Sequence, residues 1–190
     1  MHKYSLAIQP HDVLLFRVAE MKKQLRQAIG AHYGSANALA HISLFEWKIV
    51  DDKYTAVVSG LRQLIAGLSP FTIVFDGFDY FEHMTHFTFY MKLHPESSQT
   101  IIEYSQYIRQ LSTATLHSRF YSPHLSIGRR LTKEGLVLAQ ELFTECKASD
   151  FCEAFVVRKF NAQRGQYDII EKLPLLAEGL YVNRQSRLFH

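Results

Sequence analysis

The chain has 190 residues, of which 47% are hydrophobic and 21% are charged, a composition typical of a globular protein long enough to bury a core. The formal net charge of +3 is compatible with an anionic ligand but too small to predict nucleic-acid binding by itself. The sequence holds no run of about 18 apolar residues, which excludes a membrane-spanning helix.

The N-terminal segment "MHKYSLAIQPHD" lacks the apolar stretch of a signal peptide, so a cytoplasmic location is expected. In that compartment thiols stay reduced. We therefore expect Cys146 and Cys152 to be free thiols rather than a disulfide.

The first half of the chain alternates between two kinds of apolar pattern. Runs rich in β-branched and aromatic residues predict strands, and apolar residues spaced three and four apart predict amphipathic helices. Asp12 and Asp52 are plausible N-caps for the two helices. The predicted elements are strand 3–9, helix 13–29, strand 41–49, helix 53–68 and strand 71–78.

The second half repeats this alternation and adds one strand. "FDGFDYFEHMTH" is expected to join the halves through a turn at its glycine, and "NAQRGQY" to form the last hairpin. Thr132 is a plausible N-cap. The predicted elements are strand 86–93, helix 97–111, strand 122–129, helix 132–146, strand 152–161 and strand 166–173.

The two halves therefore share one element order, strand-helix-strand-helix-strand. A shift of the first half by 82 or 83 residues superimposes its elements on those of the second half. This repeat predicts an α+β protein with two pseudo-symmetric lobes built from a duplicated βαβαβ unit.

One tetrapeptide pattern recurs at equivalent places of the repeat, in the middle strand of each unit. It reads His41-Ile42-Ser43-Leu44 and His124-Leu125-Ser126-Ile127. Side chains at i and i+2 of a strand lie on the same face. Each strand is therefore predicted to present a histidine and a serine side by side, backed by apolar residues.

Two such faces across a cleft suit the chemistry of a phosphodiester. One imidazole, when neutral, accepts a proton from the attacking oxygen, and the other, when protonated, donates one to the leaving oxygen. Ser43 and Ser126 are predicted to donate hydrogen bonds to the non-bridging oxygens. No metal is required.

Arg129 follows the second tetrapeptide and is a candidate to bind the phosphate through its guanidinium. Its strand parity differs from that of His124 and Ser126. It joins them only if a bulge or a bend follows Gly128.

Competing histidines weaken either tetrapeptide taken alone. The chain has ten histidines, and His83 and His86 also begin His-x-Thr patterns. In the repeat His86 aligns with Lys3 and has no symmetric histidine, so an ordinary strand residue is the preferred interpretation. A metal pair at His83 and His86 is disfavoured because no third ligand has a clear spacing.

With two His-x-Ser-apolar motifs about eighty residues apart, the chain resembles the 2H phosphoesterase superfamily, which includes 2′-5′ RNA ligase-like proteins and cyclic nucleotide phosphodiesterases. "FYSPHLSIGR", "PFTIVFDGFDYF" and "GQYDIIEKLPL" also resemble segments of that family. Both motifs here carry serine where threonine is commoner, a change that keeps the hydroxyl.

The resemblance implies a cleft between mainly antiparallel sheets, within a single bilobal domain over residues 1–176. The repeat halves would span about 1–83 and 84–176, and residues 177–190 would form a C-terminal tail. It also implies cofactor-free and metal-independent chemistry on 2′,3′-cyclic phosphates or 2′-5′ linkages, with His41 and His124 as the catalytic pair.

Aromatic residues near the motifs are candidates for stacking on a nucleic-acid base. Phe45 and Trp47 share the strand parity of His41 and Ser43, and Tyr121 precedes the second motif. The alternative, favoured by an aromatic content of 13%, is that such residues fill the core.

The expected partners are RNA ends or nucleotide cyclic phosphates, acted on by a monomer and without a membrane. Three other functions stay open: an RNA-end-binding protein with little turnover, a hydrolase of another small cyclic phosphate such as an ADP-ribose derivative, and a structural α+β module. The absence of a long basic run argues against tight binding to long RNA.

Overall fold

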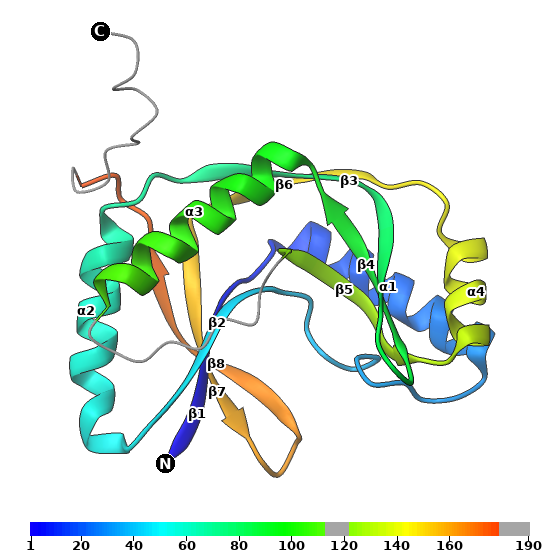
Figure 1. Ribbon diagram of the computed structural model, residues 1–190, viewed down its shortest axis with the longest axis horizontal. Helices are drawn as coiled ribbons and strands as arrows, with labels where there is room; N and C mark the ends of the chain where they lie inside the picture. Colours follow the sequence, from blue (N-terminus) through cyan, green and yellow to red (C-terminus); the bar gives the residue numbers. More distant parts are fainter. Residues whose placement is uncertain (113–121, 179–190) are drawn as a thin grey trace, which may run out of the picture.

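The computed structural model describes residues 1–112 and 122–178. In this part of the chain, eight strands form two antiparallel sheets of four, and four α-helices flank them (Figure 1). Sheet A has the order β2-β1-β7-β8 and sheet B the order β5-β4-β3-β6. The elements are β1 (His2–Ile8), α1 (Asp12–Ile29), β2 (Ile42–Ile49), a short 3-10 helix (Asp51–Lys53), α2 (Tyr54–Ala66), β3 (Phe71–Glu82), β4 (Phe87–Leu93), α3 (Pro95–Leu111), β5 (His124–Leu131), α4 (Lys133–Leu142), β6 (Lys147–Cys152), β7 (Ala154–Asn161) and β8 (Gln166–Pro174).

The third strand of each half pairs with the opposite half. β3, from the first half, pairs with β4, and β7, from the second half, pairs with β1. The predicted α+β class and antiparallel sheets are thereby confirmed. Each sheet is built from both halves of the sequence, because the chain crosses between sheets after β2 and again at Glu153.

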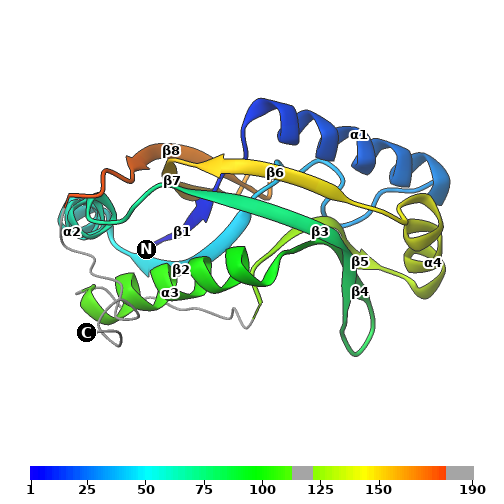
Figure 2. The same ribbon diagram turned by 90° about the horizontal axis from the view of Figure 1, so that it is seen from above.

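The helices gather at the two ends of the molecule. α1 and α4 lie beside each other next to β5, and α2 lies beside α3 and β8 (Figures 1 and 2). Their buried residues recur at the predicted spacing, as with Leu14, Val18, Met21 and Leu25 of α1. They join the sheets in one hydrophobic cluster. No helix in the described residues is both long and apolar enough to cross a membrane.

Two of the three predicted N-caps are wrong. α1 is capped by His11, with Asp12 as its first helical residue, and Asp52 lies inside the 3-10 helix. Thr132 is confirmed, because its hydroxyl oxygen accepts a hydrogen bond from the Gly135 amide at 3.1 Å. α4 ends four residues earlier than predicted, although Phe143 and Cys146 remain buried.

The join between the two halves is a longer hairpin than predicted. β3 continues through Gly77 to Glu82, and the turn lies at 83–86. Gly77 has φ = 82° and sits at an irregularity in the pairing of β3 with β4, so its freedom serves a bulge rather than a turn.

β6 was not predicted from the sequence. Its residues, KASDFC, alternate between exposed and partly buried positions at the edge of sheet B, and they lack the apolar alternation that marks a strand. Cys146 and Cys152 flank or end this strand as buried free thiols.

Candidate active site

The two motif strands lie at the edges of their sheets. β2 is an edge strand of sheet A and β5 is an edge strand of sheet B, although each is the middle strand of its half in chain order. The two strands contact each other. His41 immediately precedes β2 and His124 begins β5, so the contact between these edge strands brings the two motif strands side by side.

Each histidine is held by a hydrogen bond to the backbone carbonyl oxygen of the residue two positions before it. Nδ1 of His41 lies 2.8 Å from the carbonyl oxygen of Leu39, and Nδ1 of His124 lies 2.9 Å from that of Ser122. A carbonyl oxygen only accepts, so Nδ1 is the protonated nitrogen in each neutral ring. Nε2 is then left with a lone pair that can take a proton.

A β-bulge follows the serine of each motif. Leu44 is the extra residue in the pairing of β2 with β1, and Ile127 is the extra residue in the pairing of β5 with β4. A bulge inverts the facing of every later residue in its strand. The repeat thus extends to an irregularity that the sequence pattern did not predict.

In β5 this bulge brings Arg129 to the face of the motif. Ser126 pairs with Tyr90 and Arg129 pairs with Thr88, and Tyr90 and Thr88 lie on one face of β4. Arg129 therefore shares a face with Ser126, as a bulge in β5 was expected to allow. The bulge lies at Ile127, one residue before Gly128, and not after Gly128 as expected. The equivalent position in β2 is Glu46.

In β2 the bulge turns both predicted stacking residues into the core. Phe45 is 0% exposed and Trp47 is 1% exposed. Trp47 stacks on Tyr4, its cross-strand partner, with ring centres 5.7 Å apart. The prediction that Phe45 and Trp47 stack on a substrate base is wrong, because neither ring reaches the surface. Tyr121 lies outside the described residues.

His124 is also fixed by aromatic neighbours. Its ring meets Phe81 edge-on at 4.9 Å between centres and lies 5.0 Å from the ring of Tyr90. These contacts restrict rotation of the imidazole. Burial lowers the pKa of His124 and the charge of Arg129 lowers it further, while the hydrogen bond that Nδ1 donates to the Ser122 carbonyl oxygen raises it.

His41 lies among cations. Burial lowers its pKa far below the ordinary value, and the charges of Arg158, Lys22 and Arg129 lower it further, while the hydrogen bond with Leu39 raises it. Arg129 acts on both histidines. The positive charges that act on the pair favour a bound anion.

Lys22 and Arg158 were not predicted from the sequence. Lys22 is buried in α1, where its Nζ donates to the carbonyl oxygen of Ala38 at 2.7 Å and burial lowers its pKa to about 8. A lysine within an amphipathic pattern reads as an ordinary surface residue, so only the fold reveals its burial.

The loop between α1 and β2 links the two motifs through hydrogen bonds to the backbone of β5, a contact that the sequence did not predict. Buried Ser35 donates to the Ile127 carbonyl oxygen at 3.2 Å and accepts from the Arg129 amide at 3.0 Å. The Gly34 amide donates to the Arg129 carbonyl oxygen at 3.1 Å. A Cβ at Gly34 would lie 3.0 Å from that oxygen, so only glycine fits without displacement. The bulge of β5 is thus held by the loop that leads to His41.

The competing histidines lie in the β3–β4 hairpin. The rings of His83 and His86 stack with centres 4.6 Å apart, and Nε2 of His83 lies 3.2 Å from the hydroxyl of Thr88. Within residues 1–112 and 122–178, no group of three or more His, Cys, Asp and Glu side chains gathers as metal ligands.

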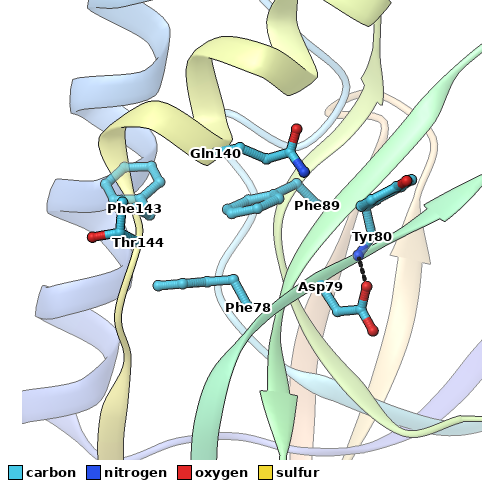
Figure 3. A pocket seen from close by; sticks show the side chains of 7 residues that line it. All are labelled: Phe78, Asp79, Tyr80, Phe89, Gln140, Phe143 and Thr144. Atoms are coloured by element: carbon cyan, nitrogen blue, oxygen red, sulfur yellow. Dashed lines mark hydrogen bonds between the residues drawn. The ribbon is translucent and has the colours of Figure 1, made fainter.

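Two pockets lie near these elements. A pocket of about 350 Å³, shown in Figure 3, is bounded by Phe78 and Phe89 of sheet B and by Phe143 after α4. Neighbouring strand residues face opposite ways. Because Tyr90 packs on His124, Phe89 and this pocket lie on the far side of sheet B from the histidines.

A smaller pocket of about 70 Å³ lies directly beside the motifs. Its lining includes Ser43 of β2, Pro123 just before His124, and Gln106 and Arg109 of α3. This pocket thus joins residues of both motif segments to α3.

Two antiparallel sheets with a histidine motif at an edge strand of each fit the 2H phosphoesterase class. A family model for the 2′-5′ RNA ligase superfamily matches residues 12–163, so the chain belongs to this family. It is an enzyme of the 2H phosphodiesterase and 2′-5′ RNA ligase-like type. A search of curated proteins gave no significant match.

Solved structures share the fold at low sequence identity. TT0787 of Thermus thermophilus is 14% identical with a TM-score of 0.68, covering 94% of this chain and 100% of that one. Escherichia coli LigT, solved with 3′-AMP, is 15% identical with a TM-score of 0.59, covering 92% and 98%. Kluyveromyces marxianus Usb1, solved with uridine monophosphate, is 13% identical with a TM-score of 0.55, covering 92% and 98%.

Proposed function

We propose that the protein is a metal-independent phosphoesterase that hydrolyses a 2′,3′-cyclic phosphate at an RNA end or on a nucleotide, or acts on a 2′-5′ linkage. The observation that carries the proposal is the matched pair of histidines. Both are anchored through Nδ1 to a backbone carbonyl, both stand at edge strands that contact each other, and the charge of Arg129 acts on both.

The proposed hydrolysis divides the work between the two rings. Nε2 of the neutral histidine removes a proton from water as the water oxygen bonds to phosphorus. Nε2 of the protonated histidine gives its proton to the ribose oxygen as that phosphorus–oxygen bond breaks. Ser43, Ser126 and Arg129 donate hydrogen bonds to the non-bridging oxygens, where negative charge increases in the transition state.

A bound phosphate anion favours the protonation state that this mechanism needs, with one histidine neutral and the other protonated. Without substrate, burial and the charge of Arg129 lower the pKa of both histidines, which favours two neutral rings. A phosphodiester anion between them raises both pKa values, because an opposite charge stabilises imidazolium. One ring is then protonated in the complex.

Relatives support a nucleotide as the ligand class. LigT is solved with 3′-AMP and Usb1 with uridine monophosphate. The small pocket beside Ser43 and Pro123 is placed to receive the group next to the phosphate.

The test is hydrolysis in EDTA of nucleoside 2′,3′-cyclic phosphates, oligoribonucleotides ending in a cyclic phosphate, and a cyclic phosphate of an ADP-ribose derivative. His41→Ala and His124→Ala are each expected to lose about a hundredfold or more, the size of a lost general acid or base. His86→Ala, from the neighbouring hairpin, is the matched control. Full activity of either motif variant, or a comparable loss in His86→Ala, would contradict the proposal.

A further inference from the structure

Arg158 lies at the centre of sheet A on the face of the first motif. It pairs with Ser5, and Ser5 pairs with Glu46, so these three residues form a row across β7, β1 and β2. Ser43 lies on the same face of β2 as Glu46. The guanidinium therefore shares its side of the sheet with the motif of His41.

The hydrogen bonding of Arg158 is incomplete. The residue is 5% exposed, and its Nη2 donates to the Ser5 hydroxyl at 2.9 Å. The buried Nε has no acceptor in the described part of the chain. The ring of Tyr167 lies 5.1 Å from the guanidinium carbon and covers it. Buried donors without acceptors are rare and call for a specific explanation.

No carboxylate forms an ion pair with this guanidinium in residues 1–112 and 122–178. Glu46, in the same row, is engaged elsewhere: its carboxylate lies 3.0 Å from Lys3 Nζ and accepts from the Tyr167 hydroxyl at 2.7 Å. The charge of Glu46 acts on Arg158 without a direct contact. A buried cation without a paired anion is strongly disfavoured unless a ligand supplies that anion.

The position of Arg158 relative to His41 indicates where that ligand lies. Among the charged groups that face His41, Arg158 from β7 lowers its pKa most, ahead of Lys22 from α1 and Arg129 from β5. Arg129 approaches from sheet B, whereas Arg158 approaches from sheet A. The charges of two guanidinium groups, one from each sheet, thus act on His41 and would attract an anion beside it.

We propose that Arg158 is a phosphate-binding residue of the active site, which donates from sheet A to a phosphate oxygen that Arg129 approaches from sheet B. The inference rests on the proposed function for the identity of the phosphate as the reacting group. The planar guanidinium suits this ligand because it presents several donors in a fixed geometry to phosphate oxygens.

The test compares Arg158→Met with Lys159→Met, which removes the same charge from the next residue of β7, on the opposite face. Inorganic phosphate binding is measured by calorimetry on the full chain, and folding by the urea midpoint. Arg158→Met is expected to weaken phosphate binding about tenfold or more, the worth of a charge-assisted hydrogen bond. Its urea midpoint is expected to stay equal or rise, because an apolar residue of similar length replaces an unpaired buried charge.

Lys159→Met is expected to bind phosphate within about twofold of the wild type, since no contact to the site is removed. Equal phosphate affinity in Arg158→Met and Lys159→Met, or a wild type that binds no phosphate, overturns the inference. A fall in the urea midpoint without a change in affinity identifies a structural role and overturns it as well.

Arg158→Lys covers the case in which Arg158→Met does not fold. It keeps the charge but loses the planar donor geometry, so a loss of phosphate affinity between those of the wild type and the methionine variant is expected, and wild-type affinity contradicts the inference. If the wild type binds phosphate through Arg158 but hydrolyses no cyclic phosphate, the proposed reaction fails while the binding role of Arg158 stands.

Discussion

At the scale of single residues, one hydrogen bond determines what each histidine can do. The bonds between Nδ1 and the carbonyl oxygens of Leu39 and Ser122 orient the rings and leave Nε2 for chemistry. Neighbouring cations and burial then favour the neutral form. In the proposed mechanism, a bound anion raises the pKa of the pair so that one ring becomes protonated.

This arrangement makes stability depend on pH in a predictable direction. The folded pKa values of both histidines are lowered, so the unfolded chain binds more protons below the ordinary histidine pKa of about 6.5. The contribution of the two histidines to the free energy of unfolding is expected to be at its maximum above that pH and to decrease as the pH falls below it. Urea denaturation at a series of pH values measures this. The double variant His41→Asn/His124→Asn should show a shallower fall, and an unchanged slope would refute the assignment.

A substitution at Phe45 distinguishes a role in core packing from a role in substrate contact. Phe45→Leu is expected to lower the free energy of unfolding by about 1 kcal/mol, because a buried ring is replaced by a smaller apolar side chain. KM for a cyclic phosphate is expected to stay unchanged because the ring does not reach the site. Denaturation and initial-rate kinetics on the same variant supply both numbers, and a raised KM with normal stability would restore the stacking role.

At the scale of elements, the loop between α1 and β2 holds the two motifs in register. Ser35 bridges the carbonyl of Ile127 and the amide of Arg129, and Gly34 binds the carbonyl of Arg129. The backbone of the second motif is therefore fixed by the segment that leads into the first.

Ser35→Ala is expected to destabilise the protein by about 1–3 kcal/mol, because a buried amide loses its acceptor. Turnover should fall as well, since Arg129 is no longer held in place. Exposed Ser59 of α2 provides the control Ser59→Ala, which is expected to change neither quantity. Normal turnover by Ser35→Ala, at temperatures where the variant is folded, would show that the loop does not influence the active site and would contradict this prediction.

At the scale of the whole molecule, the exchange of β3 and β7 makes the two halves interdependent. Sheet A needs β7 and β8 from the second half, and sheet B needs β3 from the first. A fragment of residues 1–83 or 84–176 is therefore expected to lack stable structure by circular dichroism. The full chain is expected to unfold in one transition that coincides by fluorescence and circular dichroism. A half that folds alone would contradict this interdependence.

The segment that follows β8 is bound to the end of α2. The amides of Leu176 and Glu178 donate to the carbonyl oxygen of Ala66, and that of Ala177 donates to Leu68. Hydrogen bonding to the body of the protein thus continues two residues past the expected boundary at 176. Residues 179–190 lie outside the described part of the chain.

The sequence predicted those features that follow from periodicity and repetition. Spacing of apolar residues located all four helices, and the repeat identified the histidine pair and its symmetric context. Neither periodicity nor repetition reveals a bulge, because one extra residue in a strand leaves no recognisable sequence pattern. The face of the strand on which Phe45, Trp47 and Arg129 lie could therefore be learned only from the structure. Nor does either reveal a charged side chain that becomes buried through contacts distant in sequence, as with Lys22 and Arg158.

The extra residue after each serine has a consequence for any change in strand length. Leu44 acts as an inserted step that turns the remainder of β2 over. Deletion of Leu44 would leave Ser43 opposite Ala7 and Phe45 opposite Leu6 in an unbroken pleat, so Trp47 would stay in the core and Glu46 on the face of Ser43. The last position of the tetrapeptide is thus a place where β2 can lose a residue and keep its faces, whereas loss of the paired residue Phe45 would move Glu46 opposite Leu6 and turn the later side chains over.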